Sequence, residues 1–252
     1  MKVLTVYAHP RRASFCHAVL EEFTAGLREA GHESRVIDLH AIRFNPVFGR
    51  FDYASYVDEH IPEKSLEQLD LRRTILEEAG GPLRRAVAAR LVRGKSPQQL
   101  ARWIRARRPR DVVAQQRQVA WAEGLAFVAP IHFCHLPAIL KGWMDRVFTH
   151  GFAFRLTEEG WSGDLAGRVP LLRHRRALIM TSTLFGEQTY DGPVRDAMTR
   201  LIADWGLRVP GIKDVEHVFF HGATSAPPDV IARYLEQARE LGRTFERESA
   251  EQ

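Results

Sequence analysis

Three side chains that can exchange protons or bind a metal ion, His132, Cys134 and His135, directly follow an apolar run at residues 125–128. The run has the length and composition of a buried strand. Phe133 lies among the three polar side chains and adds a planar ring. In open α/β sheets, ligands bind at the carboxyl ends of the strands. The sequence therefore predicts a binding site on the loop that follows this strand.

A second candidate group follows the expected first strand, where His9 and Pro10 precede Ser14, Phe15 and Cys16. Ser14 is a good N-cap for a helix that begins there. The first N–H groups of a helix have no intrahelical acceptor and can hold a phosphate group. The pattern predicts a phosphate-binding turn, with a plain turn and an ordinary helix cap as the alternative.

Hydroxyl groups follow another expected strand, at residues 176–181. Ser182 and Thr183 come directly after it, and Tyr190 lies seven residues further on. These side chains are therefore expected at the same sheet edge as the first two groups. The alternative for Tyr190 is a residue on a surface loop.

Strands and helices alternate along most of the chain. The expected strands are residues 2–8, 33–38, 124–128, 176–181 and 216–220, and the expected helices are residues 14–30, 111–123, 137–148, 191–205 and 227–248. Such alternation predicts a parallel sheet that is covered on both faces. Five strands of this kind suit a doubly wound α/β fold of the flavodoxin-like type, in one domain that covers residues 1–252.

Residues 62–110 do not fit this alternation and are expected to form a basic helical insertion before the third strand. From Arg72 to Arg110 there are twelve Lys and Arg residues and two acidic residues, whereas the whole chain has a net charge of +5. A solvated helical face or a dimer contact explains this charge best. Nucleic acid is a weaker explanation because Trp103 is the one aromatic residue among the charges. A lid that attracts the phosphates of NADPH is a further alternative.

The composition limits the class of protein. The chain has 252 residues, of which 45% are hydrophobic, and no apolar run has the length of about 20 residues that a membrane helix needs. The first apolar stretch is too short for a signal peptide. Cys16 and Cys134 are far apart in the sequence, and free thiols suit a reducing compartment. We therefore expect a cytoplasmic protein without a membrane span.

Three blocks of the sequence resemble the NAD(P)H:quinone oxidoreductases of the flavodoxin-like superfamily. They are residues 7–18, residues 130–154 and the weaker group at 182–190. Within the second block, the letters PAILKGW at residues 137–143 are close to the family pattern. The resemblance covers most of the expected carboxyl edge of the sheet outside the insertion.

The resemblance implies a bound flavin, FAD in most members, with FMN as the alternative. It implies that NADPH or NADH donates a hydride to the flavin, which passes it to a quinone or a similar two-electron acceptor. It also implies a homodimer with the active site at the subunit interface. The cofactor supplies the hydride chemistry, and the protein supplies position and electrostatics.

The resemblance also assigns roles to residues. The catalytic candidates are Tyr190 and His132, and the substrate-contacting candidates are His135, Phe154 and Leu156, of which the last two have hairpin-core positions as their alternative. No metal ligand is expected. The cofactor-binding candidates are His9, Ser14, Phe15, Cys16, Ala18, Pro130, Ile131, His132, Phe133, Cys134, Ser182, Thr183 and Tyr190.

The chain departs from the family pattern at several of these positions. Cys16 replaces a usual Asn, and His132 and Phe133 replace Gln and Trp. Leu184 and Phe185 replace paired glycines. The family has a histidine after the tyrosine, whereas no histidine follows Tyr190 within this loop. These departures keep open a second hypothesis, in which the chain is a regulatory or ancillary flavoprotein with little turnover.

Two metal-dependent hypotheses fit less well. His132, Cys134 and His135 do not have the spacing of a known zinc site, and no fourth ligand is evident. A zinc-dependent hydrolase would need acidic residues after His9 and Pro10, where the chain has Arg11 and Arg12.

Overall fold

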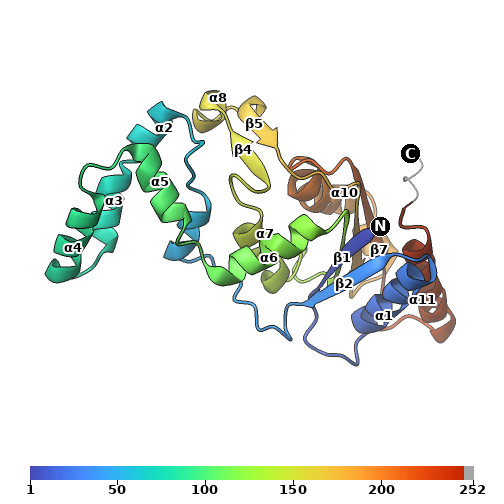
Figure 1. Cartoon of the computed structure of the whole chain (residues 1–252). Helices are drawn as coiled ribbons and strands as arrows, with labels where there is room; N and C mark the ends of the chain where they lie inside the picture. The colour runs from blue at the N-terminus through green and yellow to red at the C-terminus, as the bar shows by residue number, and fades with distance from the viewer. Residues whose placement is uncertain (247–252) are drawn as a thin grey trace.

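The computed structural model describes residues 1–246 and shows a central parallel sheet of five strands (Figure 1). The strands lie in the order β2-β1-β3-β6-β7. Their bounds are β1 (Lys2–Tyr7), β2 (Glu33–Asp38), β3 (Gly124–Pro130), β6 (Arg176–Ser182) and β7 (Asp214–Phe220). This order confirms the prediction of a flavodoxin-like doubly wound fold.

Helices cover both faces of the sheet. Helices α1 (Phe15–Glu29) and α11 (Pro228–Arg243) pack on one face and share a buried core with side chains such as Phe23, Val128 and Met180. Helices α6 (Arg110–Trp121) and α7 (Ala138–Val147), with α10 (Pro193–Thr199) and its π-helical continuation η3 (Arg200–Arg208), share the core on the other face. Strand β3 is buried along its whole length because it lies between the two layers.

The predicted element boundaries differ from the observed ones by a few residues. Strand β3 runs two residues further than expected, so Pro130 is part of the strand. Strand β7 begins at Asp214, two residues before the expected start. Helix α11 ends at Arg243, and the expected end at residue 248 lies outside the described residues. The helix that was expected at residues 191–205 begins two residues later, at Pro193, and continues through η3 to Arg208.

Residues 62–110 contain four short helices, in agreement with the expected helical character of this segment. They are α2 (Glu63–Gln68), α3 (Leu71–Glu78), α4 (Pro82–Val92) and α5 (Pro97–Arg105). These helices lie at the opposite end of the molecule from α1 and α11 (Figure 1). They share a small apolar cluster of their own, which includes Leu66, Val92 and Leu100. We refer to this segment as the basic arm, and its status as an insertion within one domain stays a prediction.

A group of short elements connects the arm with the sheet. These elements are η1 (Arg50–Ser55), α8 (Glu158–Trp161), η2 (Leu165–Gly167) and the antiparallel hairpin of β4 (Phe154–Leu156) and β5 (Arg168–Pro170). A hairpin core was the alternative expectation for Phe154 and Leu156, and both residues lie in β4 of this hairpin. The bounds of its strands were not predicted, because each strand has only three residues.

The arm is held to the hairpin side by a buried carboxylate, Asp58. Its Oδ2 atom lies 3.3 Å from His150 Nδ1 and 3.6 Å from Arg105 Nη1. Burial opposes ionisation of Asp58, but His150 and Arg105 favour its charged form and lower its pKa to about 2. Asp58 is therefore a carboxylate at neutral pH, and its charge is already compensated within the chain.

A buried arginine joins three elements below the carboxyl edge of the sheet. Arg146 of α7 donates from Nε to Asp52 Oδ1 of η1 (2.8 Å) and from Nη1 to Asp111 Oδ2 of α6 (2.6 Å). It also donates to the carbonyl oxygen of Asn45 (2.7 Å). Removal of one partner of a buried ion pair leaves the other charge without compensation and is strongly destabilising.

We therefore expect Arg146→Met to lower the free energy of unfolding by about 3 kcal/mol, because Asp52 would remain as a buried, uncompensated carboxylate. Urea denaturation measures this change. The control is Lys141→Met in the same helix, because Lys141 pairs with Asp145 on the exposed surface, where such a pair contributes at most about 1 kcal/mol. An equal decrease in the free energy of unfolding of the two variants would contradict the prediction.

Candidate functional site

The carboxyl ends of β1, β3, β6 and β7 meet at a half-open recess of about 430 Å³. Backbone hydrogen bonds continue the strand pairing beyond the strand ends: Ile131 N–H donates to Ser182 O (2.8 Å), and Thr183 N–H donates to Phe220 O (3.0 Å). The loops after the strands are therefore fixed relative to one another. The recess is lined by His9, Arg11, Ala13, Ser14, Phe15, Cys16, Pro130, Ile131, His132, Ser182, Thr183, Leu184, Ala223 and Thr224.

The turn after β1 forms one wall of the recess. Ser14 caps α1, and its Oγ accepts a hydrogen bond from His17 N–H (3.2 Å). The N–H groups of Phe15 and Cys16, the first two residues of the helix, precede any intrahelical acceptor. They lie at the positive end of the helix dipole, which favours an anion.

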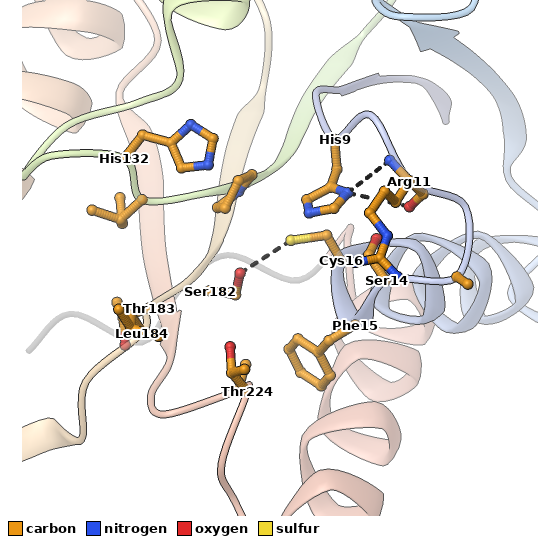
Figure 2. Close-up of a pocket in the computed structure, with 14 residues that line it drawn as sticks. His9, Arg11, Ser14, Phe15, Cys16, His132, Ser182, Thr183, Leu184 and Thr224 are labelled. Atoms are coloured by element: carbon orange, nitrogen blue, oxygen red, sulfur yellow. Dashed lines mark hydrogen bonds between the residues drawn. The ribbon is translucent and has the colours of Figure 1, made fainter.

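His9 faces this wall (Figure 2). Its Nδ1 atom lies 3.1 Å from the backbone N and 3.2 Å from the carbonyl oxygen of Arg11, so the Arg11 backbone fixes the ring and leaves Nε2 for a ligand. Burial, with smaller effects from neighbouring groups, lowers the pKa of His9 below its usual value. The lowered pKa favours a neutral imidazole, while Arg11 supplies the positive charge.

The floor of the recess contains a thiol and a hydroxyl in contact. Cys16 Sγ lies 3.1 Å from Ser182 Oγ, as Figure 2 shows. Burial raises the pKa of Cys16 to about 11, although the contact with Ser182 acts in the opposite direction. Cys16 is therefore an uncharged thiol that closes the floor between α1 and β6, and it is not a nucleophile at neutral pH.

The loop after β6 is held from behind by His221, which the sequence analysis did not identify. Thr183 Oγ1 donates to Phe185 O (2.8 Å) and lies 3.3 Å from His221 Nδ1. Because the threonine proton is used in that bond, His221 Nδ1–H is the donor to Thr183. Burial lowers the pKa of His221, which favours this neutral imidazole. His221 therefore fixes the orientation of a hydroxyl that lines the recess.

Tyr190 does not line the recess. It is buried at the end of α9 (Glu187–Tyr190), and its ring stacks on His221 at 5.6 Å between ring centroids. Although no histidine follows Tyr190 in its own loop, β7 brings one against its ring. The predicted catalytic role of Tyr190 has no direct geometric support within this single chain, and it stays a prediction.

The loop after β3 is divided between the recess and solvent. Pro130, Ile131 and His132 line the recess, whereas Phe133 and Cys134 do not. The backbones of His132 and His135 exchange two hydrogen bonds (2.9 and 3.1 Å) across a two-residue turn. Both turn residues have positive φ values, 47° and 66°, so the Phe133 ring points fully into solvent.

The remaining predicted residues lie outside the recess. Ala18 is on the second turn of α1, and His135 closes the two-residue turn. Phe154 and Leu156 are half-buried in the β4–β5 hairpin. The Arg168 guanidinium lies over the Phe154 ring, with 4.3 Å between Arg168 Cζ and the ring centroid. Their predicted substrate contacts are not formed by one chain alone.

Five residues of the recess were not among the predicted site residues: Arg11, Ala13, Leu184, Ala223 and Thr224. Leu184 was noted only as a departure from the family pattern. Arg11 and Ala13 lie in the turn that was already expected to bind phosphate, so their position was an available signal. Ala223 and Thr224 follow β7 directly, at the same sheet edge, and the general rule for parallel sheets would have included them.

No group of three or more His, Cys, Asp or Glu side chains that could hold a metal ion occurs in residues 1–246. Within the same residues, no helix is both long and apolar enough to cross a membrane.

Comparison with known proteins defines the class. The family of the flavodoxin-like fold matches residues 1–241, and the chain belongs to this family. It is 27% identical over 238 residues to NAD(P)H dehydrogenase [quinone] 1 of Cavia porcellus, and this match covers 93% of this chain and 73% of the relative. It is 28% identical over 205 residues to the ribosyldihydronicotinamide dehydrogenase-like protein traD of Penicillium crustosum, which covers 79% of this chain and 65% of that protein.

A solved structure extends the likeness to the complete chain. The NAD(P)H:quinone oxidoreductase from Methanothermobacter marburgensis is 26% identical, with a TM-score of 0.69, over 100% of this chain and 99% of that chain. The resemblance to NAD(P)H:quinone oxidoreductases, which the sequence blocks indicated, is therefore confirmed.

The two thiols differ in accessibility, since Cys16 is buried and Cys134 is exposed. We expect 5,5′-dithiobis(2-nitrobenzoic acid) to titrate one thiol per native chain at pH 8 and two per chain in denaturant, because Cys16 with a pKa of about 11 stays protonated and enclosed. Absorbance of the released thiolate measures both counts. The native Cys134→Ser variant should release almost no coloured thiolate. Rapid release of thiolate by that variant would contradict this account of Cys16.

Proposed function

We propose that this protein is a flavin-dependent NAD(P)H oxidoreductase that reduces a quinone or a similar two-electron acceptor. The observation that carries the proposal is the convergence, in one recess, of the α1 N-terminus and Arg11 with the hydroxyls of Ser182, Thr183 and Thr224. The relatives named as quinone oxidoreductases support the same class of enzyme.

The residues of the recess fit the anionic part of a flavin nucleotide. The N–H groups of Phe15 and Cys16, the neutral imidazole of His9 and the guanidinium of Arg11 would hold the phosphate. A bound flavin accepts a hydride from NAD(P)H and passes it to the acceptor. The role of the chain itself is to bind and orient the flavin. None of the side chains that line the recess carries a negative charge that would repel the flavin phosphate.

The other end of the recess fits a planar ring. Pro130 and Ile131 offer an apolar wall, and Ser182, Thr183 and His132 offer hydrogen-bonding groups at its edge. Leu184 also lines the recess, where the family resemblance implies a glycine. Its side chain would form part of the wall and limit how closely a ring approaches the β6 loop.

FAD is the proposed cofactor because of the family resemblance, with FMN as the alternative. A relative from Photorhabdus laumondii that is named an FMN-dependent NADH:quinone oxidoreductase is 31% identical, but over 46% of this chain. Mass spectrometry of the flavin that is released on heating decides between the two cofactors.

A homodimer in the cytoplasm is part of the proposal. Phe154, Leu156 and His135 lie outside the recess of their own chain, so a role in acceptor binding requires a second copy to bring them there. The two free cysteines are consistent with a reducing compartment.

We expect purified protein to bind flavin and quench its fluorescence, and NADH or NADPH to bleach the bound flavin without oxygen. Arg11→Gln should raise the dissociation constant of the flavin by about tenfold, because a charge-assisted contact to phosphate is lost. Arg12→Gln is the matched control, since Arg12 is adjacent and exposed but does not line the recess. Folded protein that takes up no flavin would contradict the proposal.

A flavin that binds tightly but is not bleached by either nicotinamide would instead favour an ancillary flavoprotein. The buried position of Tyr190 and the intrusion of Leu184 are the observations that support this second function.

The contact between His221 and Thr183 gives a separate prediction. His221→Phe keeps a ring on Tyr190 but removes the hydrogen bond to Thr183, so we expect the dissociation constant of the flavin to rise about fivefold. Fluorescence titration measures it. His217→Phe is the control, because His217 lies on β7, the strand that ends directly before His221, and contacts Thr181 (2.9 Å), which does not line the recess. Equal effects of the two substitutions would assign His221 a general structural role.

A further inference from the structure

The basic arm and the sheet domain border two open recesses that share two lining residues, Ala106 and Arg108. The larger has a volume of about 630 Å³ and lies between η1 and the start of α6. The smaller, of about 310 Å³, lies between α5 and the residues around Gly151 and Arg155. Neither shares a lining residue with the candidate flavin site.

The acidic residues of the two recesses are already paired. Asp52 accepts from Arg146, and Asp58 lies beside Arg105 and His150. Glu59 lies 3.5 Å from the guanidinium of Arg102. The negative charges that line the recesses are therefore neutralised by their own partners.

Four further arginines line the recesses, and none of them has a carboxylate partner among residues 1–246. They are Arg107, Arg108, Arg110 and Arg155. The Arg107 guanidinium lies over the Trp103 ring at 3.4 Å and donates to Trp103 O (2.8 Å), and it is therefore held in place.

Arg108 is the central member of this set. It is half-buried, and its Nε and Nη1 donate to two uncharged oxygens, Arg105 O (3.0 Å) and Gln116 Oε1 (3.5 Å). Burial and the neighbouring Arg105 lower its pKa, whereas the carboxylates of Asp58 and Glu59, which pair with Arg105 and Arg102, act in the opposite direction. A partly desolvated cation with neutral partners gains most from an anion that fills the remaining hydrogen-bonding positions.

The larger recess also has an apolar side. Phe51 and Val47 both line it, and each exposes about two thirds of its surface. Exposed aromatic and aliphatic surface beside a cluster of guanidinium groups suits a ligand that combines a planar ring with an anionic group.

We propose that these recesses form a binding site for an organic phosphate, with the phosphate on Arg108, Arg107 and Arg110 and a planar ring against Phe51. Guanidinium groups bind phosphate through paired hydrogen bonds, which makes arginine the suitable residue for this task. The inference goes beyond the proposed oxidoreductase activity and does not depend on it.

A nucleic acid is the competing occupant of the basic arm. Its backbone would contact arginines along the whole surface, including Arg84 and Arg90 of α4. The four arginines without an ion-pair partner in the described part of the chain instead gather around two open recesses of small-molecule size. The observations therefore favour the small organic phosphate.

The test is isothermal titration calorimetry of flavin-saturated protein with ADP, inorganic pyrophosphate and adenosine. Excess flavin blocks the first recess, so the titration reports the arginine site. We expect ADP to bind, pyrophosphate to bind more weakly and adenosine to bind least. Arg108→Gln and Arg110→Gln should each weaken ADP binding by about tenfold. The side chain of Arg110 makes no hydrogen bond or ion pair within residues 1–246, so its substitution tests the site with little effect on folding.

The control is the double variant Arg84→Gln, Arg90→Gln, which removes two exposed charges from α4 and should leave ADP binding unchanged. Absence of ADP and pyrophosphate binding would overturn the proposal, as would binding that both recess variants retain. Binding of a 20-nucleotide single strand that the α4 variant loses would assign the charge to nucleic acid instead. If the protein takes up no flavin, the same titration in an Arg11→Gln background separates the two sites.

Discussion

The structure depends on the parallel pairing of β1, β3, β6 and β7, which continues for one or two residues beyond the strand ends. Ala8, Ile131 and Thr183 each donate a backbone hydrogen bond to the neighbouring strand or loop after their own strand has ended. Four loops that are far apart in the sequence are thereby brought to one edge at fixed spacing. The recess is a consequence of that pairing, because no single loop contains more than a part of its lining.

Much of the fold could be predicted because its information is local. Buried parallel strands such as β3 are continuous apolar runs, and α1 has a serine cap and an apolar face with a helical period. The β4–β5 hairpin was anticipated only as an alternative for Phe154 and Leu156, because three-residue strands have no readable alternation. The four helices of the arm were only partly anticipated, since α4 carries arginines around most of its circumference and has little amphipathic pattern.

The site could be predicted to the level of strand ends, but not to the level of side-chain direction. Ser14, Pro130 and Ser182 line the recess as expected because residue order along a loop fixes their place. Phe133 and Tyr190 do not, since a left-handed turn points one ring into solvent and ring stacking buries the other. His221 was missed because its contact with Thr183 joins residues 38 positions apart, which no local pattern reveals.

The turn at Phe133 and Cys134 has an energetic consequence for the isolated chain. Left-handed backbone costs an L-residue with a side chain about 1 kcal/mol, and here two consecutive non-glycine residues adopt it. An Asn-Gly pair would form the same turn with less strain. The present sequence instead presents a fully exposed aromatic ring on a turn that two backbone hydrogen bonds close. A partner surface that covered this ring would remove its apolar area from water, and the backbone of the turn would already be ordered.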